Sequence, residues 1–245
     1  MAYERLAAHY DRFTQDVNYA AFIAYYETAW QRANVTPTLL LDLACGTGTI
    51  SHMLADKGYE VIGVDASPEM LMEAYSKMST AETPPVFINQ RMDELDLYGT
   101  INAVVCALDS VNYVTDPTEL QRAFDKVSLF MEPDGIFIFD ANTDAKFKSL
   151  DGTAYTREDE NTFCVYQLDY EDSICVHTVD IFERRGKTYT RSTEYHEERG
   201  YTIPILTDML LKAGFDRIEA CKAFAFDPAD EQEHRVFFIA RKPKE

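Results

Sequence analysis

The chain passes from an apolar strand into a glycine-rich loop at Leu40-Leu41-Asp42-Leu43-Ala44-Cys45-Gly46-Thr47-Gly48-Thr49. A loop of this kind, placed between a buried strand and the next helix, lets the backbone approach a ligand closely at the carboxyl edge of a parallel sheet. Asp65 stands nineteen residues after Gly46, at the end of the next predicted strand. An acid there can accept hydrogen bonds from both hydroxyls of a ribose. Loop and acid together predict a site for a nucleoside-containing cofactor.

Two further residues distinguish between the candidate cofactors. A dinucleotide-binding loop continues to a third glycine, whereas this chain has Ser51 at that position. Asp42 stands where such a loop has an apolar residue, because a carboxylate would repel the nearby pyrophosphate. The same carboxylate would attract the ammonium group of S-adenosylmethionine. Asp42 and Asp65 therefore favour S-adenosylmethionine over NAD, and a structural turn with a solvated Asp42 is the alternative without a ligand.

Short apolar strands alternate with helical segments as far as Asp140, after a helical start at residues 2–33. Strands that are apolar throughout are buried on both faces, which is typical of a parallel sheet between helices. The predicted strands cover 38–43, 61–64, 86–88, 101–108, 135–140, 218–226 and 235–240, and the predicted helices cover 49–57, 68–78, 117–131 and 205–213. This pattern predicts an α/β fold with a doubly wound, mostly parallel, seven-stranded Rossmann-like sheet.

A different pattern follows Asp140. Residues 161–196 alternate polar and apolar side chains between turn signals, which is typical of an antiparallel β meander. We therefore expect an α/β core at 1–142 and 203–245 that carries a β insertion at 143–202. An insertion after the fifth strand can fold over the carboxyl edge of the sheet and cap a substrate there.

The composition argues against several classes of protein. The chain of 245 residues has 23 basic and 42 acidic residues and a net charge of −19, which disfavours a broad nucleic-acid footprint. No apolar run approaches the roughly 18–20 residues of a membrane span, and the start of the chain does not read as a secretory signal. The 5 cysteines are widely spaced without a C-x-x-C pair, which favours reduced thiols over disulfides or zinc. We expect a cytoplasmic protein without a metal or membrane contact, and its oligomeric state stays open.

Several motifs together resemble the class I S-adenosylmethionine-dependent methyltransferases, and in particular a bacterial subgroup of small enzymes. Leu41–Gly48 resembles the first motif of that family, and Val61–Leu71 resembles the second, in which the ribose-binding acid precedes S-x-x-M-L. Cys106–Tyr113 is similar to a DSLNY stretch in the subgroup. The subgroup's opening and its lead into the fifth strand are matched by Tyr10-Asp11 with Asp16-Val17-x-Tyr19, and by Met131–Asp140.

The resemblance implies which residues hold the cofactor. The glycines would let the loop wrap the methionine part, Asp65 would hold the ribose, and Ala66 and Met70 would flank the adenine. The backbone of Leu108 would face the amino end. The full set of expected cofactor-binding residues is Tyr10, Asp42, Ala44, Cys45, Gly46, Gly48, Asp65, Ala66, Met70, Met92, Asp93 and Leu108.

The sequence departs from the family at the adenine. Similar sequences place an acid earlier in the run after the third strand, where it accepts from the exocyclic amine, whereas here the acid is displaced by two positions to Asp93. Either Asp93 takes that role after a small shift of the loop, or the backbone of Met92 alone holds the adenine.

Methyl transfer from a sulfonium depends mainly on alignment, and a general base is needed only when the acceptor bears a proton of high pKa. Asp109 and Asn112 follow the fourth strand and could orient an acceptor, or else cap the next turn. His196, near the return of the insertion to the core, could act as a base, or else be a solvated loop residue. The aromatic and acidic residues of the insertion would suit a cationic or planar acceptor, or else pack the meander itself.

These observations favour an enzyme that transfers a methyl group from S-adenosylmethionine to a small molecule, with an amine as one candidate acceptor. Methylation of RNA or protein is a second reading, and the net charge of −19 disfavours RNA. A non-catalytic module that binds S-adenosylmethionine is a third reading. A nicotinamide-dependent oxidoreductase is a fourth, which Ser51 and Asp42 both oppose.

Overall fold

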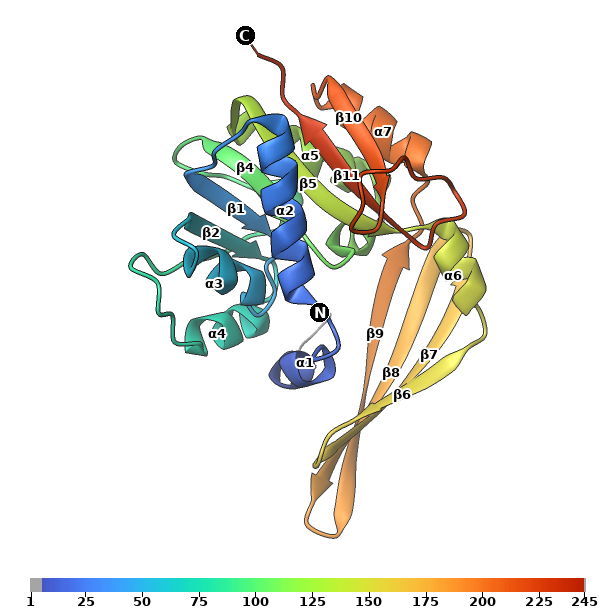
Figure 1. Cartoon of the computed structure of the whole chain (residues 1–245). Coiled ribbons are helices and arrows are strands. Elements are labelled where there is room, and N and C mark those ends of the chain that lie inside the picture. Colours follow the sequence, from blue (N-terminus) through green and yellow to red (C-terminus); the bar gives the residue numbers. More distant parts are fainter. Residues whose placement is uncertain (1–5, 245) are drawn as a thin grey trace.

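A mostly parallel sheet of seven strands lies at the centre of the computed structural model, which describes residues 6–244 (Figure 1). Its strands are β1 (Leu39–Leu43), β2 (Glu60–Asp65), β3 (Val86–Asn89), β4 (Ile101–Cys106), β5 (Met131–Asn142), β10 (Arg217–Lys222) and β11 (Arg235–Arg241). They lie in the order β10-β11-β5-β4-β1-β2-β3. β1 to β5 pair in parallel, and β11 is antiparallel to both of its neighbours. The predicted α/β fold is confirmed.

Helices cover both faces of this sheet (Figure 1). They are α1 (Ala7–Phe13), α2 (Tyr19–Ala33), α3 (Thr49–Ala55), α4 (Pro68–Ser76), α5 (Pro117–Phe130), α6 (Asp144–Leu150) and α7 (Ile203–Lys212), with the short 3-10 helices η1 (Met92–Glu94) and η2 (Ser110–Tyr113). Local chemistry sets their starts: the Ser67 hydroxyl accepts from the backbone N–H of Met70, and Pro68 takes the first helical position of α4. Among the described helices, none is long and apolar enough to cross a membrane.

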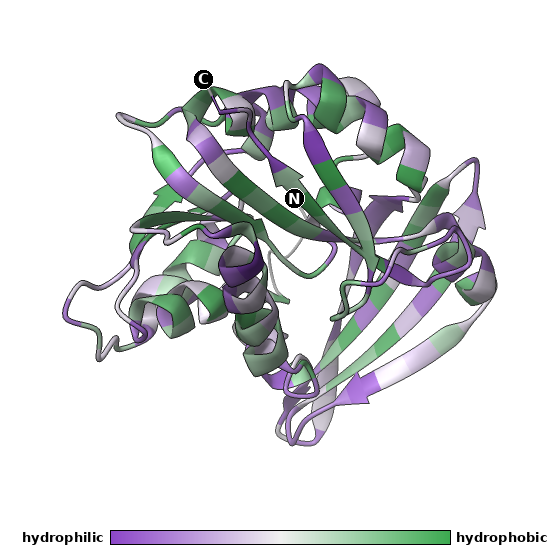
Figure 2. Cartoon of the chain, turned by 45° about the horizontal axis from the view of Figure 1, so that its top comes forward, coloured by the Kyte–Doolittle hydropathy of each residue, from purple (hydrophilic) through white to green (hydrophobic). Residues whose placement is uncertain are grey.

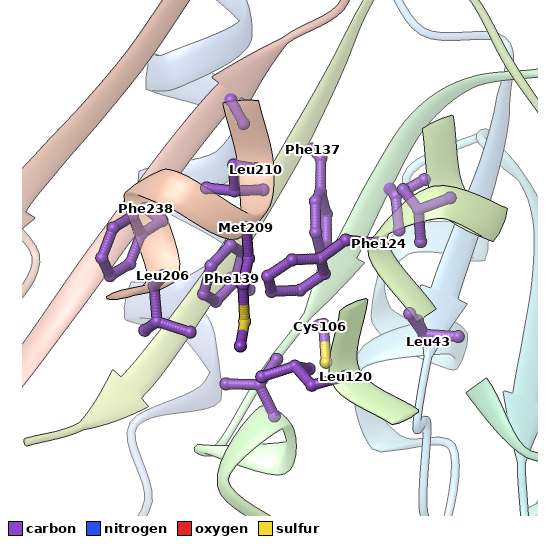
Figure 3. Packing of buried hydrophobic residues seen from close by; sticks show 14 of the residues in the cluster. Leu43, Cys106, Leu120, Phe124, Phe137, Phe139, Leu206, Met209, Leu210 and Phe238 are labelled. Atoms are coloured by element: carbon purple, nitrogen blue, oxygen red, sulfur yellow. The ribbon is translucent and has the colours of Figure 1, made fainter. Parts of the chain in front are cut away.

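Alternate residues of the central strands pack into two separate layers. Phe137 and Phe139 of β5 join α5 and α7 on one face, where they contact the ring of Phe124 (Figure 3). Ile136 and Ile138 of the same strand pack with α2 and α3 on the other face. Burial on both faces explains why β5 is apolar throughout rather than alternating.

The insertion forms a second sheet, with β6 (Ala154–Glu158), β7 (Thr162–Glu171), β8 (Ile174–Arg185) and β9 (Thr188–Arg199) paired antiparallel in that order. Its strands show alternating hydrophobic and hydrophilic bands, as a sheet with one buried face should (Figure 2). The long β8–β9 hairpin extends away from the core (Figure 1). The predicted meander is therefore present, and α6 precedes it as a helix that the sequence pattern did not indicate.

Candidate active site

The glycine-rich loop joins β1 to α3, and three of its residues have a positive φ: Ala44 (57°), Gly46 (55°) and Gly48 (71°). The two glycines have different reasons to be glycine. A Cβ on Gly46 would meet nothing within 4 Å, so that position leaves open space for a ligand. A Cβ on Gly48 would lie 2.7 Å from the ring of Phe87, so that position is required by packing. Cys45 lies between Ala44 and Gly46 and donates its backbone N–H to the carbonyl of Val64 in β2.

Asp65 ends β2 beside this loop. Its two carboxylate oxygens accept from the backbone N–H groups of Gly46 and Ser67, each at 2.8 Å. Burial raises the pKa of Asp65, and these N–H groups act in the opposite direction by stabilising its anion. A carboxylate has about four acceptor positions, so two stay available to the hydroxyls of a ribose.

Asp42 lies on β1 beneath the loop and is only 1% exposed. Its carboxylate accepts from the Ser51 hydroxyl at 2.5 Å, and burial raises its pKa to about 7. Asp42 lines a small cavity of about 40 Å³ together with Tyr10, Ala44, Cys45, Gly46 and Leu108. A buried carboxyl group facing this cavity is placed to receive an ammonium group.

The residues expected around the adenine lie at the ends of β2 and β3. Met70 of α4 is buried, Ala66 is exposed, and Met92 is half-buried in η1. The carboxylate of Asp93 is held by two guanidinium groups, those of Arg91 and Arg122, each at 3.0 Å. These ion pairs lower the pKa of Asp93 although burial opposes them. Asp93 is thus part of an ion-pair cluster, and its hydrogen bond to an adenine stays a prediction.

A larger cavity of about 380 Å³ lies between the carboxyl edge of the central sheet and the meander. Tyr10 and Leu108 line both this cavity and the smaller one, so the two meet at these residues. One part of the larger cavity is apolar and aromatic. There the rings of Tyr155 and Tyr166 stack, with their centroids 4.7 Å apart and an interplanar angle of 4°. Phe13 lines the same cavity.

The opposite part of the larger cavity, its polar end, begins where β4 ends. Leu108 and Asp109 have positive φ values of 56° and 53°, an uncommon conformation for residues with a Cβ. The Asp109 carboxylate pairs with Arg235 of β11 at 2.5 Å, and Arg235 also pairs with the fully buried Asp140. Asp140 in turn accepts from the backbone N–H of Asp109 at 3.1 Å. Asp109 lines the larger cavity, and its role in orienting an acceptor stays a prediction.

The placement of Asn112 contradicts its expected contact with an acceptor. Its side chain is fully buried and does not line the larger cavity. The amide nitrogen donates to the backbone carbonyls of Asn142 and Arg199, at 2.9 and 2.8 Å, and the amide oxygen accepts from the backbone N–H of Asn142. These three bonds use the hydrogen-bonding groups of the Asn112 side chain. Asn112 therefore joins η2 to β5 and β9.

His196 is a strand residue, not a solvated loop residue. It lies on β9, is 4% exposed, and lines the larger cavity directly opposite His177 of β8. Its Nε2 lies 3.2 Å from Glu194. Burial, followed by the neighbouring His196, lowers the pKa of His177 to about 4.

Sequence reasoning missed several residues of the polar end, namely Lys146, His177, Glu198 and Arg235. The sequence held a signal for Glu198. Glu194, His196 and Glu198 recur at two-residue spacing, which places these three side chains on one face of a strand. That this face is buried against the core follows only from the tertiary structure.

A Rossmann-like sheet, a glycine loop at its switch point, and two acids placed for an amino-acid end and a ribose define a class I methyltransferase that depends on S-adenosylmethionine. The open space at Gly46 and the available acceptor positions of Asp65 fit that cofactor.

Comparisons with known proteins agree with this class. A family model for a methyltransferase domain matches residues 40–135. YqeM of Bacillus subtilis (strain 168), which is classed as a methyltransferase, is 32% identical over 249 residues, covering 100% of this chain and 98% of YqeM. The chain therefore belongs to the class I S-adenosylmethionine-dependent methyltransferases, so the expected family, enzyme class and cofactor are confirmed.

Two solved structures show how far the fold extends. An S-adenosylmethionine-dependent methyltransferase from Clostridium acetobutylicum ATCC 824 has a TM-score of 0.87 and 27% identity, covering 99% of this chain and 100% of that one. The sugar N-methyltransferase KedS8 from Streptoalloteichus sp ATCC 53650 has a TM-score of 0.78 and 22% identity, covering 96% and 93%. Both matches include the meander as well as the central sheet.

Proposed function

We propose that this methyltransferase acts on a small molecule bound in the larger cavity, with an amine as the acceptor group. The observation that carries the proposal is the meeting of the two cavities at Tyr10 and Leu108, which lets an acceptor in one face a methyl group in the other. The volume of about 380 Å³ is within the range of small-molecule sites. KedS8 is named as a sugar N-methyltransferase, and its fold includes the corresponding meander.

The residues divide this task between cofactor and acceptor. The cofactor supplies an activated methyl group on a sulfonium, so the protein has mainly to align the acceptor with it. Asp65 and Asp42 hold the two ends of the cofactor, and Asp93 or the backbone of Met92 holds the adenine. Asp109 and His196 lie at the polar end and contact the acceptor. The meander at 143–202 serves as the substrate cap.

Other features support a small-molecule enzyme over the alternatives. An inactive binding module would have its acceptor cavity filled by side chains, whereas the larger cavity is open to a ligand. RNA as substrate is disfavoured by the charge of −19. All 5 cysteines are free thiols, which supports a reducing location such as the cytoplasm.

Calorimetric titration with S-adenosylmethionine, S-adenosylhomocysteine and NAD tests the cofactor site. We expect micromolar binding of the first two ligands, about −8 kcal/mol, and none of NAD. Asp65→Ala should weaken that binding by about a hundredfold, because charge-assisted hydrogen bonds to the ribose are lost. Glu60→Gln, at the exposed start of the same strand, is the matched control. Unchanged binding by Asp65→Ala, or binding of NAD alone, would contradict the proposal.

A further inference from the structure

Charge at the polar end of the larger cavity is not balanced by the protein itself. Three carboxyl groups gather there, those of Asp109, Asp140 and Glu198, against two cations, Lys146 and Arg235. At the far end of the cavity, Asp16 and Arg157 neutralise each other. The polar end is therefore one positive charge short when all three carboxyl groups are ionised.

The two histidines do not supply this charge. Burial and His196 keep the pKa of His177 at about 4, so His177 is neutral near neutral pH. His196 faces Glu194 at 3.2 Å, so any charge on it is matched within that pair.

Glu198 is placed to hold a compensating proton. Its side chain is 2% exposed, accepts from the Asn142 amide at 3.4 Å, and lies 3.3 Å from His177. Glu198 also lines the same cavity as Asp109, so two carboxyl groups share one poorly solvated site. Burial, and then the charge of Asp109, raise the pKa of Glu198. Asp109 remains the anionic partner because its carboxylate pairs with Arg235.

We propose that Glu198, which lies with Asp109 at the polar end of the cavity, exchanges its proton for the positively charged amino group of the acceptor. This inference rests on the proposed function and narrows its substrate class to cationic amines, since a neutral hydroxyl or a carboxylate could not replace the proton electrostatically. The aromatic part of the cavity, with the stacked rings of Tyr155 and Tyr166, then receives the body of the amine.

The exchange also prepares the nitrogen for reaction. Binding of the ammonium ion releases the proton of Glu198 to solvent and leaves Glu198 ionised. The ammonium then gives one proton to Glu198, which frees the lone pair of the nitrogen. That lone pair forms the new N–C bond while the C–S bond breaks, and its electron pair stays on sulfur. The methylated ammonium ion leaves, and Glu198 keeps the proton, which restores its initial state.

Benzyltrimethylammonium is a suitable probe because it has a fixed charge and no proton of its own. We expect it to bind the protein saturated with S-adenosylhomocysteine, and more tightly than benzyl alcohol or benzoate. Titrations in buffers of different ionisation enthalpy should show release of about one proton per cation bound. Glu198→Gln should bind the cation at least about tenfold more weakly and release no proton. Glu197→Gln, an exposed residue of the same strand, is the matched control.

The outcomes separate this inference from the proposed function. If the wild type does not bind S-adenosylhomocysteine, the proposed function fails. If it binds that ligand but prefers benzoate, does not bind the cation, or binds the cation without releasing a proton, only the inference about Glu198 is overturned. Proton release is measured on the wild type, so the test stands even if Glu198→Gln unfolds.

Discussion

Asp42 combines a cost in stability with a proposed role in cofactor binding. Its carboxyl group is buried at 1% exposure, and burial raises its pKa from 3.8 to about 7. Between these two pH values the folded state holds a proton that the unfolded state has lost, so stability falls as the pH rises through this window. Above it the folded protein carries a buried anion, and a cofactor ammonium group is its natural partner.

Replacing that carboxyl group should therefore have opposite effects on stability and binding. We expect Asp42→Asn to raise the free energy of unfolding by about 2–4 kcal/mol near neutral pH, with the gain shrinking as the pH is lowered toward 4. The same variant should bind S-adenosylhomocysteine about tenfold or more weakly. Urea unfolding at several pH values and calorimetry provide the two measurements. A pH-independent gain would show that Asp42 is ionised in the folded state throughout.

Asn112 is a residue whose importance is structural. Three hydrogen bonds join its buried amide to backbone groups of β5 and β9. We expect Asn112→Ala to lower the free energy of unfolding by about 3 kcal/mol, because buried backbone groups lose their partners. The exposed Asn161→Ala should stay within about 0.5 kcal/mol of the wild type in the same urea titration. A variant of normal stability that has lost activity would instead support direct contact with the acceptor.

The helix α1 bridges the two sheets. Its Asp11 accepts from the Thr47 hydroxyl of the cofactor loop at 2.5 Å. At the end of α1, the carbonyl of Phe13 accepts a hydrogen bond from Arg157 of β6 at 2.6 Å. Asp16, which follows α1, pairs with the same arginine at 3.1 Å. Residues 6–18 are thereby tied to both sheets, and Tyr10 among them lines both cavities.

Releasing this element should loosen the site without unfolding the protein. We expect Arg157→Ala to speed amide hydrogen exchange at residues 6–18 by about two- to fivefold, which is the range for partly exposed ion pairs. S-Adenosylhomocysteine should also dissociate faster from this variant. Arg184→Ala, at the exposed tip of the β8–β9 hairpin, is the control. Exchange that is unchanged at 6–18 would show that other contacts hold α1.

For the whole molecule, net charge limits the possible substrates more than any single residue does. A charge of −19 repels a phosphodiester backbone at distances up to about a Debye length, about 8–10 Å at physiological salt. Neutralisation of phosphates by Lys and Arg supplies most nucleic-acid affinity, and in this chain 42 acidic residues outnumber the 23 basic ones.

We therefore expect no RNA binding in a mobility-shift assay at physiological salt and up to about 10 μM protein. S-Adenosylmethionine should be present throughout, so that the cofactor site is saturated. Micromolar RNA binding with a steep salt dependence would favour the RNA methyltransferase reading over a small-molecule enzyme.

The sequence alone determined the central sheet and the cofactor end of the site. Strand periodicity, the loop with Gly46 and Gly48, and the acids Asp42 and Asp65 are local features, separated by short stretches of chain whose relative positions the fold class dictates. Strand boundaries were less accurate where a turn took over: the predicted strand 101–108 ends at Cys106, because Leu108 and Asp109 adopt positive φ.

Only the tertiary structure decided the acceptor end. Asp109 follows β4, Arg235 lies on β11 and Glu198 lies on β9, and they meet because the meander folds back over the carboxyl edge of the sheet. The alternating sequence pattern around a histidine or glutamate is the same whether that face of the strand is exposed to water or packed against another element. The same limit explains Asn112, whose residue type suits a substrate contact and a buried backbone clamp equally well. Burial is set by contacts distant in sequence, so it decides protonation and partners that no local pattern contains.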